Sequence, residues 1–125
     1  IVLYPTAIGS GLGGGGDLLT GNDSVNAWRN AMCGHAACNI LPVVTSNRIG
    51  REYMTEDGKS HLDFYGSSFI ADHEGQVVEQ AGRDQEEVLV HRFNFQKVKE
   101  YRDSWAVFRD RRPDLYGALT TLDGG

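Results

Sequence analysis

Apolar positions in the first part of the chain predict two strands with a helix between them. The short apolar run Ile1–Tyr4, which Pro5 stops, indicates a fully buried strand. Asp23 or Ser24 can cap the following helix, and its apolar face is expected to consist of Val25, Trp28, Met32 and Ala36. A second buried strand is expected over Ile40–Val44.

Shorter segments in the second part predict strands joined by tight turns. Glu56–Lys59 contains an Asp-Gly pair, which is typical of a hairpin turn. A second turn at His73–Gly75 is expected to join a strand over Ser67–Ala71 to another over Gln76–Glu79. Glu87–Phe93 alternates between polar and apolar residues, which indicates a further strand.

The last part of the chain predicts a helix and a charged tail. Asn94 can cap a helix whose apolar positions include Phe95, Val98 and Trp105. Pro113 can start a short final helix. The order of strand, helix, strand, hairpin strands and helix predicts a mixed α/β layer structure, with residues 1–125 in a single domain.

Composition and charge narrow the choice of partners and compartment. The balance of 12 Lys and Arg against 17 Asp and Glu gives a net charge of −5, which argues against nucleic acid. No apolar run approaches the roughly 18 residues of a membrane span, so a membrane partner is not expected. Two cysteines, Cys33 and Cys38, are too few for a disulfide scaffold and favour the reducing cytoplasm.

The glycine-rich segment Gly9–Gly16 is expected to be a flexible loop. Part of it fits the G-x-G-x-x-G spacing of dinucleotide-binding loops. Such a site requires a helix to begin at the last glycine, whereas the first helix cap here comes only at Asp23. No acidic residue follows directly after Val44, where a ribose would be bound. A loop is therefore favoured over a dinucleotide site.

Potential nucleophiles and metal ligands do not form a complete set. Cys33, His35 and Cys38 point around the first helix rather than toward one metal. No base or fixed cation lies nearby in the sequence to activate a thiol, so buried and inert cysteines are favoured. The remaining histidines are scattered, with no catalytic role expected for them: His61, His73 and His91. A metal site is not expected.

Three arginines lie close together in the tail, at Arg109, Arg111 and Arg112. They can bind a phosphate or form salt bridges between subunits. Asp110 and Asp114 interrupt the basic run. This pattern favours salt bridges between subunits over a ligand site.

Five blocks of sequence, in the same order along the chain, resemble the nitrilase (carbon–nitrogen hydrolase) superfamily, and most closely its members that act on carbamoyl amines. The blocks are Tyr4–Ser10 (YPTAIGS), Gly34–Asn39 (GHAACN), Val44–Gly50 (VTSNRIG), Phe64–Ala71 (FYGSSFIA) and Arg109–Tyr116 (RDRRPDLY). The resemblance implies a four-layer α-β-β-α sandwich, of which this chain is the C-terminal portion. It also implies a homo-oligomer, with the C-terminal tail at an interface.

The resemblance implies a Glu base, a Lys and a Cys nucleophile, without metal or organic cofactor. In the family all three residues precede the YPTAIGS block, so they are expected upstream of Ile1, and this chain alone is expected to be inactive. The chain has no initiator Met and opens within an apolar run. We therefore expect this chain to be the C-terminal part of a longer protein. In this part alone, Ile1–Tyr4 and Ile40–Val44 are expected to leave unpaired sheet edges.

The family blocks also imply which side chains form the substrate pocket. Substrate-binding positions are expected at Thr6, Ala7, Ile8, Asn47 and Arg48, while Asn39 is expected to bond backbone. The implied substrate is a small carbamoyl amine resembling N-carbamoylputrescine. Alternatives are a β-ureidopropionase-like or other amidase of the family, or a non-catalytic relative that serves in assembly.

Overall fold

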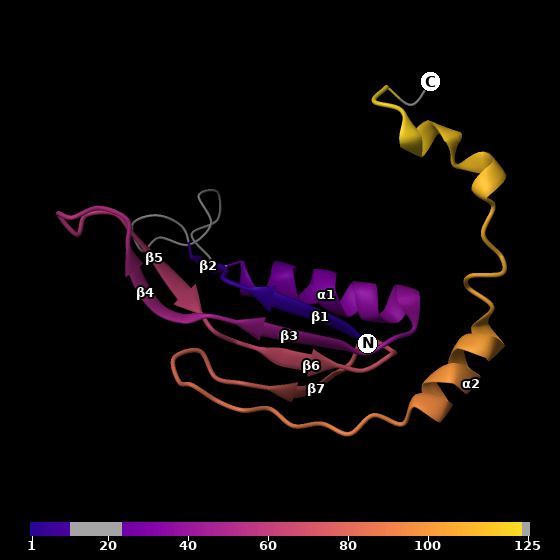
Figure 1. Cartoon of the computed structure of the whole chain (residues 1–125), viewed down its shortest axis with the longest axis horizontal. Helices are drawn as coiled ribbons and strands as arrows, with labels where there is room; N and C mark the ends of the chain where they lie inside the picture. The colour runs from indigo at the N-terminus through magenta and orange to yellow at the C-terminus, as the bar shows by residue number, and fades with distance from the viewer. Residues whose placement is uncertain (11–23, 124–125) are drawn as a thin grey trace.

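The computed structural model describes residues 1–10 and 24–123. Figure 1 shows two sheets, a helix covering one of them, and a C-terminal arm. The elements in chain order are β1 (Val2–Thr6), β2 (Gly9–Ser10), α1 (Val25–Asn39), β3 (Val43–Asn47), β4 (Ile49–Tyr53), β5 (His61–Tyr65), β6 (Phe69–Ala71), β7 (Val77–Gln80), α2 (Phe95–Trp105) and the 3₁₀ turns η1 (Pro113–Leu115) and η2 (Gly117–Thr120). The strands form a four-stranded sheet in the order β1-β3-β6-β7 and a three-stranded sheet in the order β2-β5-β4.

A β1–α1–β3 unit organises the larger sheet. Strands β1 and β3 are parallel, in a register that pairs Val2 with Val43 and Thr6 with Asn47. A parallel pair needs a long crossover, and α1 supplies it along one face of the sheet (Figure 1). The carboxyl ends of both strands consequently lie side by side.

Helix α1 has the apolar face that the sequence predicts. Trp28 and Ala36 are buried, and Val25 and Met32 pack against the same core. Ser24 stands at the N-cap position, but its side chain makes no capping hydrogen bond. The alternative cap, Asp23, and most of the predicted glycine loop lie outside the described residues.

The second predicted strand begins later than expected. Ile40, expected to begin a strand, is instead the C-cap of α1 with a left-handed φ of 47°, and its N–H points to the carbonyls of Ala36 and Ala37. The strand predicted over Ile40–Val44 therefore starts only at Val43. The expectation of an unpaired edge there is wrong, because β3 pairs with β1 on one side and β6 on the other.

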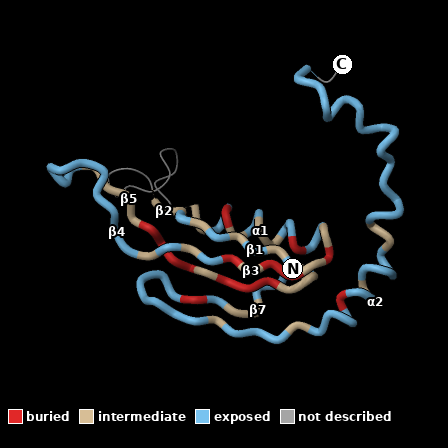
Figure 2. Tube along the Cα trace, in the orientation of Figure 1, coloured by how far each residue is buried: buried red, intermediate tan, exposed pale blue. Residues whose placement is uncertain are grey.

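The hydrophobic core lies between α1 and the sheet. Trp28 meets Phe69 edge-on, with ring centroids 5.4 Å apart, and is tilted against Tyr65 at 5.9 Å. Val43 and Ala71 complete the buried face of the strands, each with no exposed surface. Figure 2 shows buried positions along β3 and β6 and at separate positions of α1.

Strand β1 differs from its prediction as a fully buried strand. Its burial alternates, and Leu3 is 67% exposed. The strand also continues through Pro5 to Thr6 rather than stopping at the proline. Among the described residues β1 pairs only with β3, and an edge strand tolerates a proline because one side needs no ladder hydrogen bonds. The expected unpaired edge at β1 is thus present in this structure.

The smaller sheet begins where the sequence predicts a loop. Gly9 and Ser10 form β2, which pairs antiparallel with β5. A Cβ on Gly9 would collide with the carbonyl of Asp63, so only glycine allows this close approach. The Asp-Gly turn predicted at Glu56–Lys59 is confirmed between β4 and β5, where the Gly58 N–H donates to the Thr55 carbonyl at 3.1 Å.

Arg51 and Asp63 face each other across the β4–β5 hairpin. The guanidinium donates two hydrogen bonds, from Nε to Oδ1 at 2.5 Å and from Nη2 to Oδ2 at 2.8 Å. The hydrogen bonds from Arg51 are the largest cause that lowers the pKa of the Asp63 carboxyl below its ordinary value. The ionised carboxylate is therefore the form that the hairpin stabilises.

Asp63→Asn is expected to remove a pH-dependent part of the stability. Because the folded-state pKa of Asp63 lies below the unfolded value of about 3.9, its contribution is present above that pH and is lost as pH falls through the folded-state pKa. The urea midpoints of the unmodified protein and the variant should differ at about pH 6 and converge as the pH falls through the folded-state pKa of Asp63. Glu56→Gln, at the exposed tip of the same hairpin, is the control. A gap between Asp63→Asn and the unmodified protein that stays constant with pH contradicts the prediction.

The prediction of a strand over Glu87–Phe93 is wrong. The segment is extended but pairs with no strand in the described part of the chain, and Val88 and Val90 are 88% and 81% exposed. Alternation alone does not make a strand, because the backbone groups need a neighbour. The prediction over Ser67–Ala71 is correct only for Phe69–Ala71, and that over Gln76–Glu79 is shifted to Val77–Gln80.

The helix cap and the short final helix predicted for the C-terminal part are confirmed. The predicted apolar face of α2 is only partly present, because Val98 is buried while Phe95 and Trp105 are 56% and 60% exposed. The Asn94 side chain caps α2 by accepting a hydrogen bond from the Lys97 N–H at 3.1 Å. Pro113 starts η1. Beyond α2 the chain extends away from the sheets as an arm (Figure 1). In the described ranges, no helix combines the length and apolarity needed to cross a membrane.

Candidate functional site

The carboxyl ends of β1 and β3 bring the sequence-predicted site residues together. Thr6 and Asn47 are the last residues of the two strands and stand opposite each other in the parallel register. Ala7 and Ile8 continue from β1 toward β2, and Arg48 follows β3 directly. Ligand sites in α/β proteins commonly form at the carboxyl ends of parallel strands. This edge of the sheet is therefore the candidate site.

Asn47 lies at the centre of this edge. Its Nδ2 donates to the carbonyls of Ile8 at 2.9 Å and Gly66 at 2.8 Å. Its Oδ1 accepts from the Ile8 N–H at 2.9 Å and lies 3.0 Å from the Thr6 hydroxyl. Both amide hydrogens of Asn47 are consequently used inside the protein.

A left-handed turn at Gly66 and Ser67 lies beside Asn47 and forms a further wall of the site, although neither residue was among the predicted site residues. The two residues have φ values of 55° and 60°. A Cβ on Gly66 would come within 3 Å of the Arg83 and Gly82 carbonyls, so glycine is required here. Ser68 anchors the turn to β3, because its Oγ accepts from the Asn47 N–H at 2.9 Å. The FYGSS block was the available signal for this turn.

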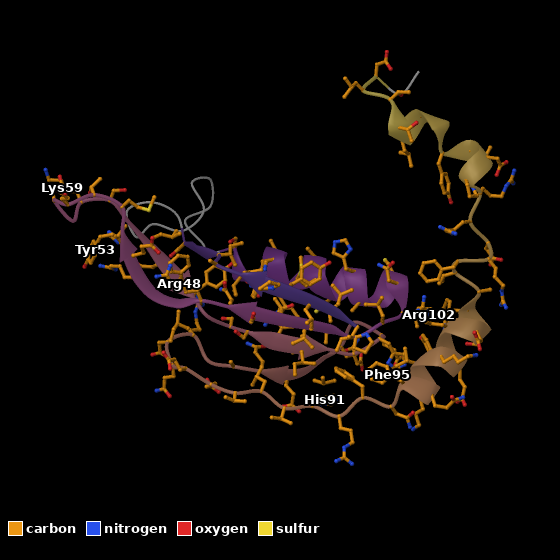
Figure 3. All side chains as sticks on the ribbon, viewed as in Figure 1. Arg48, Tyr53, Lys59, His91, Phe95 and Arg102 are labelled. Carbon is orange, nitrogen blue, oxygen red and sulfur yellow. The ribbon has the colours of Figure 1, made fainter. Side chains whose placement is uncertain are left out.

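Arg48 borders a pocket at this edge and is about half exposed. Its guanidinium forms an ion pair with Glu52 and lies over the Phe64 ring, 4.5 Å from the centroid. Figure 3 labels Arg48 at the junction of β3 and β4. Cation–π contact and the ion pair together hold the guanidinium at the rim.

The pocket has a volume of about 450 Å³ and mainly polar residues around it. Its lining comes from the end of β3, the start of β4, the turn between β5 and β6, and the segment after β7: Ser46, Asn47, Arg48, Ile49, Gly66, Ser68, Ala81, Gly82, Gln85, Glu86 and Glu87. The Glu87 carboxylate accepts a hydrogen bond from the Gly82 N–H at 2.6 Å. A volume of this size suits a small molecule.

The pocket is not lined by Thr6, Ala7 or Ile8. This segment contacts the pocket-lining Asn47, because the Thr6 hydroxyl and the Ile8 N–H both lie within hydrogen-bond distance of its Oδ1. The Thr6 hydroxyl donates to the Ser46 carbonyl at 2.8 Å. Ala7 is exposed, and Ile8 is half-buried against the core. The structure thus brings the five predicted residues to one edge of the sheet, with different exposure.

The two cysteines lie on α1, away from this edge. Cys33 is partly buried, and burial raises the pKa of its thiol, so it is a weak nucleophile. Cys38 lies near the C-terminal end of α1, close to the amino ends of β1 and β3. The prediction that both are buried is wrong for Cys38, which is exposed because it falls on the outer side of the helix. As expected, Asn39 bonds backbone, donating to the His35 carbonyl at 2.9 Å.

The remaining histidines lie in three separate segments, of which only that of His61 belongs to a strand. The His73 ring meets Tyr101 edge-on at 5.1 Å, and His91 Nδ1 lies 3.2 Å from the Glu79 carboxylate. The two ring nitrogens of His61 are buried without a hydrogen-bond partner, although Nε2 lies 3.6 Å from Asp63 Oδ2. None of the three lines the pocket beside Asn47.

Comparison with known proteins identifies the family. Residues 18–103 match the carbon-nitrogen hydrolase family, a span of more than half of the chain. The chain belongs to the carbon-nitrogen hydrolase family. The resemblance seen in the sequence blocks is thereby confirmed.

Relatives of high similarity share the whole chain but are much longer. The N-carbamoylputrescine amidases of Solanum tuberosum and Arabidopsis thaliana are each 50% identical over 125 residues, which cover 99% of this chain and 40% of theirs. The citrullinase of Francisella tularensis is 44% identical over 120 residues, which cover 95% of this chain and 39% of that protein. The chain therefore spans about 40% of the length of these carbon-nitrogen hydrolases.

Solved structures confirm the mixed α/β fold expected from the resemblance. The crystal structure of a carbon-nitrogen hydrolase from Helicobacter pylori G27 is 32% identical, with a TM-score of 0.80 over 97% of this chain and 41% of that chain. A CN-hydrolase superfamily protein from Xanthomonas campestris shares the fold, at 24% identity and a TM-score of 0.56 over 70% of this chain and 31% of that one.

Proposed function

We propose that these 125 residues are part of a hydrolase that cleaves a non-peptide C–N bond of a small carbamoyl amine. The observation that carries the proposal is the 50% identity to N-carbamoylputrescine amidases over 99% of the chain. With N-carbamoylputrescine as substrate, the products are putrescine, CO₂ and ammonia. The chain is then the C-terminal part of the carbon–nitrogen hydrolase domain.

The proposed chemistry follows from the family resemblance. The Glu takes the proton of the Cys thiol as the sulfur attacks the carbamoyl carbon. The bond to the amine breaks, and the amine leaves with that proton. A carbamoyl thioester remains. Water gives a proton to the Glu and attacks this thioester, the C–S bond breaks, and the sulfur takes the proton back from the Glu. Carbamic acid is released and decomposes to CO₂ and ammonia. The Lys stabilises the oxyanion in both steps.

The catalytic Glu, Lys and Cys are proposed to come from outside these residues, so that the isolated chain is inactive. The raised pKa of the Cys33 thiol and the position of Cys38 at the far end of α1 support this. No metal or organic cofactor is proposed. The two free cysteines favour a reducing, cytoplasmic location.

The chain is proposed to form one wall of the substrate pocket. Its substrate-binding positions are Thr6, Ala7, Ile8, Asn47 and Arg48, which meet at one edge of the sheet. The bordering pocket of about 450 Å³ supports a small-molecule substrate. The rigid Asn47 hydrogen bonds support a pre-formed wall rather than a loop that orders on binding.

A substrate panel tests the proposal. Ammonia release by the complete protein that carries this chain is measured with N-carbamoylputrescine, L-citrulline and 3-ureidopropionate. We expect the highest kcat/KM for N-carbamoylputrescine. A preference for citrulline would favour the second candidate, a citrullinase, which the 44% identical relative supports. No turnover of any ureido compound would favour a non-catalytic relative and contradict the proposal.

The C-terminal arm is proposed to lie at an interface between copies of the protein. It exposes three leucines, Leu115, Leu119 and Leu122, at 66%, 81% and 109%. Replacing all three with serine is expected to lower the oligomer mass measured by light scattering. Met54→Ser, which changes an apolar residue that is 59% exposed outside the arm, is the matched control. An unchanged mass in the leucine variant contradicts this interface.

A further inference from the structure

We infer that Asn47 is a positioning residue, whose contribution to substrate binding is indirect: its side-chain amide holds the loop after β1 and the left-handed turn after β5 in place. This inference rests on the proposed function of this edge as a pocket wall. It gives one of the expected substrate-binding residues a specific role, set by the geometry of its amide.

The side-chain amide of Asn47 makes the hydrogen bonds to Ile8 that the backbone of a neighbouring strand would otherwise make. Strand β1 ends at Thr6 and β2 begins at Gly9, so the chain passes between two sheets at Ala7 and Ile8. Asn47 accepts from the Ile8 N–H and donates to the Ile8 carbonyl, both at 2.9 Å. This is the pair of bonds that a peptide group of a neighbouring strand would supply.

The same amide reaches the turn on the other side. Its second hydrogen goes to the Gly66 carbonyl at 2.8 Å. The backbone of Asn47 adds two contacts to Ser68 Oγ, from N at 2.9 Å and from O at 3.3 Å. Three segments that are far apart in sequence, with separations of 39 and 19 residues from Asn47, are thus joined through one side chain.

This geometry requires an amide. Both hydrogens of Nδ2 point at carbonyl oxygens, and Oδ1 accepts from the Ile8 N–H. A carboxylate of the same shape keeps the acceptor but loses both donors and faces two carbonyl oxygens. Such a carboxylate is destabilised in its charged form, and protonation restores one donor. Asn47→Asp should therefore regain function as pH falls, whereas Asn47→Ala should not.

The experiment compares Asn47→Ala and Asn47→Asp with Asn39→Ala in the complete protein. Asn39 is a matched control because its Nδ2 makes one backbone hydrogen bond, to His35 at 2.9 Å, within α1. We expect Asn47→Ala to lower kcat/KM at least about tenfold, by the same factor for N-carbamoylputrescine and citrulline, because a displaced wall affects all substrates alike. The ratio of Asn47→Asp to Asn47→Ala activity should rise toward acidic pH. Asn39→Ala should stay within about twofold of the unmodified protein.

Hydrogen exchange provides a readout that is independent of turnover. Amides of the peptides that contain Ile8 and Gly66 should exchange faster in Asn47→Ala than in the unmodified protein, and Asn39→Ala should leave them unchanged. Any of three results for Asn47→Ala overturns the positioning role. These are unchanged hydrogen exchange, an activity loss below about threefold, or an activity loss that differs about tenfold between the two substrates. If the unmodified protein hydrolyses no ureido compound, the proposed function fails, and exchange alone decides whether Asn47 holds the two segments.

Discussion

Replacing Phe69 with alanine is expected to lower the free energy of unfolding by about 3–5 kcal/mol. Phe69 has no exposed surface and stands on the face of β6 that packs against α1. Its ring meets Trp28 edge-on at 5.4 Å, and its backbone pairs with Thr45 in the neighbouring strand. Truncation leaves a cavity between a helix and a sheet. The surrounding side chains hold these two layers at their spacing, so the cavity cannot close completely.

Urea denaturation of the complete protein measures this effect, and Phe95→Ala is the matched control. Phe95 is the same residue type but is 56% exposed at the start of α2. We expect the control to cost about 1 kcal/mol or less, because most of the ring already contacts solvent. Equal losses for the two variants would contradict the assignment of the core to the space between α1 and the larger sheet.

Gly66→Ala is expected to destabilise the protein by about 2–5 kcal/mol, the sum of a left-handed backbone cost of about 1–2 kcal/mol and overpacking of about 1–3 kcal/mol. Gly66 has a φ of 55°. An added Cβ would lie 2.7 Å from the Arg83 carbonyl oxygen and 2.9 Å from that of Gly82. These two obstacles are backbone atoms, and the Ile49 Cγ2 would lie 2.8 Å away as a third. The turn beside Asn47 must therefore shift to relieve them.

Gly34→Ala is the control for this substitution. Gly34 lies inside α1, and an added Cβ would meet nothing within 4 Å. Because alanine favours the helix, we expect a gain of about 0.5–1 kcal/mol there. Urea midpoints of the two variants should thus move in opposite directions. A Gly66→Ala protein as stable as the unmodified one would rule out the left-handed turn.

Local sequence signals were sufficient for both helices. The spacing of Val25, Trp28 and Met32 places them on one side of α1 whatever the helix packs against. Asn94 caps α2 through its own Lys97 N–H, a contact between neighbours in the sequence. The Asp-Gly turn between β4 and β5 is equally local. Features whose cause lies within a few residues could therefore be predicted.

Features that depend on distant neighbours were missed. The alternation of Glu87–Phe93 suits a strand, but the described residues offer it no partner. Leu3 was expected to be buried because it is apolar, yet its exposure depends on what covers that face of β1. Ile40 reads as the start of a strand, and only its left-handed φ reveals a helix cap. Pattern alone cannot supply these long-range conditions.

The candidate site likewise has features that could be predicted from the sequence and features that depend on distant neighbours. Motif resemblance placed Thr6 and Asn47 near one pocket, and the parallel register of β1 and β3 brings them together. The bonds from Asn47 to Ile8 and Gly66 could not be predicted, because they cross between segments that only the fold brings together. The role of Gly66 likewise follows from backbone atoms of residues far along the chain.

The reacting thiol of the proposed enzyme is expected to be neither Cys33 nor Cys38. The most direct measurement is ammonia release from N-carbamoylputrescine by the complete protein, by its Cys33→Ser and Cys38→Ser variants, and by the isolated 125-residue chain. We predict that both variants stay within about twofold of the unmodified protein and that the isolated chain gives no turnover. Turnover by the isolated chain, or loss of turnover in the Cys33→Ser or Cys38→Ser variant of the complete protein, would contradict the proposal that this chain frames the pocket and leaves the chemistry to other residues.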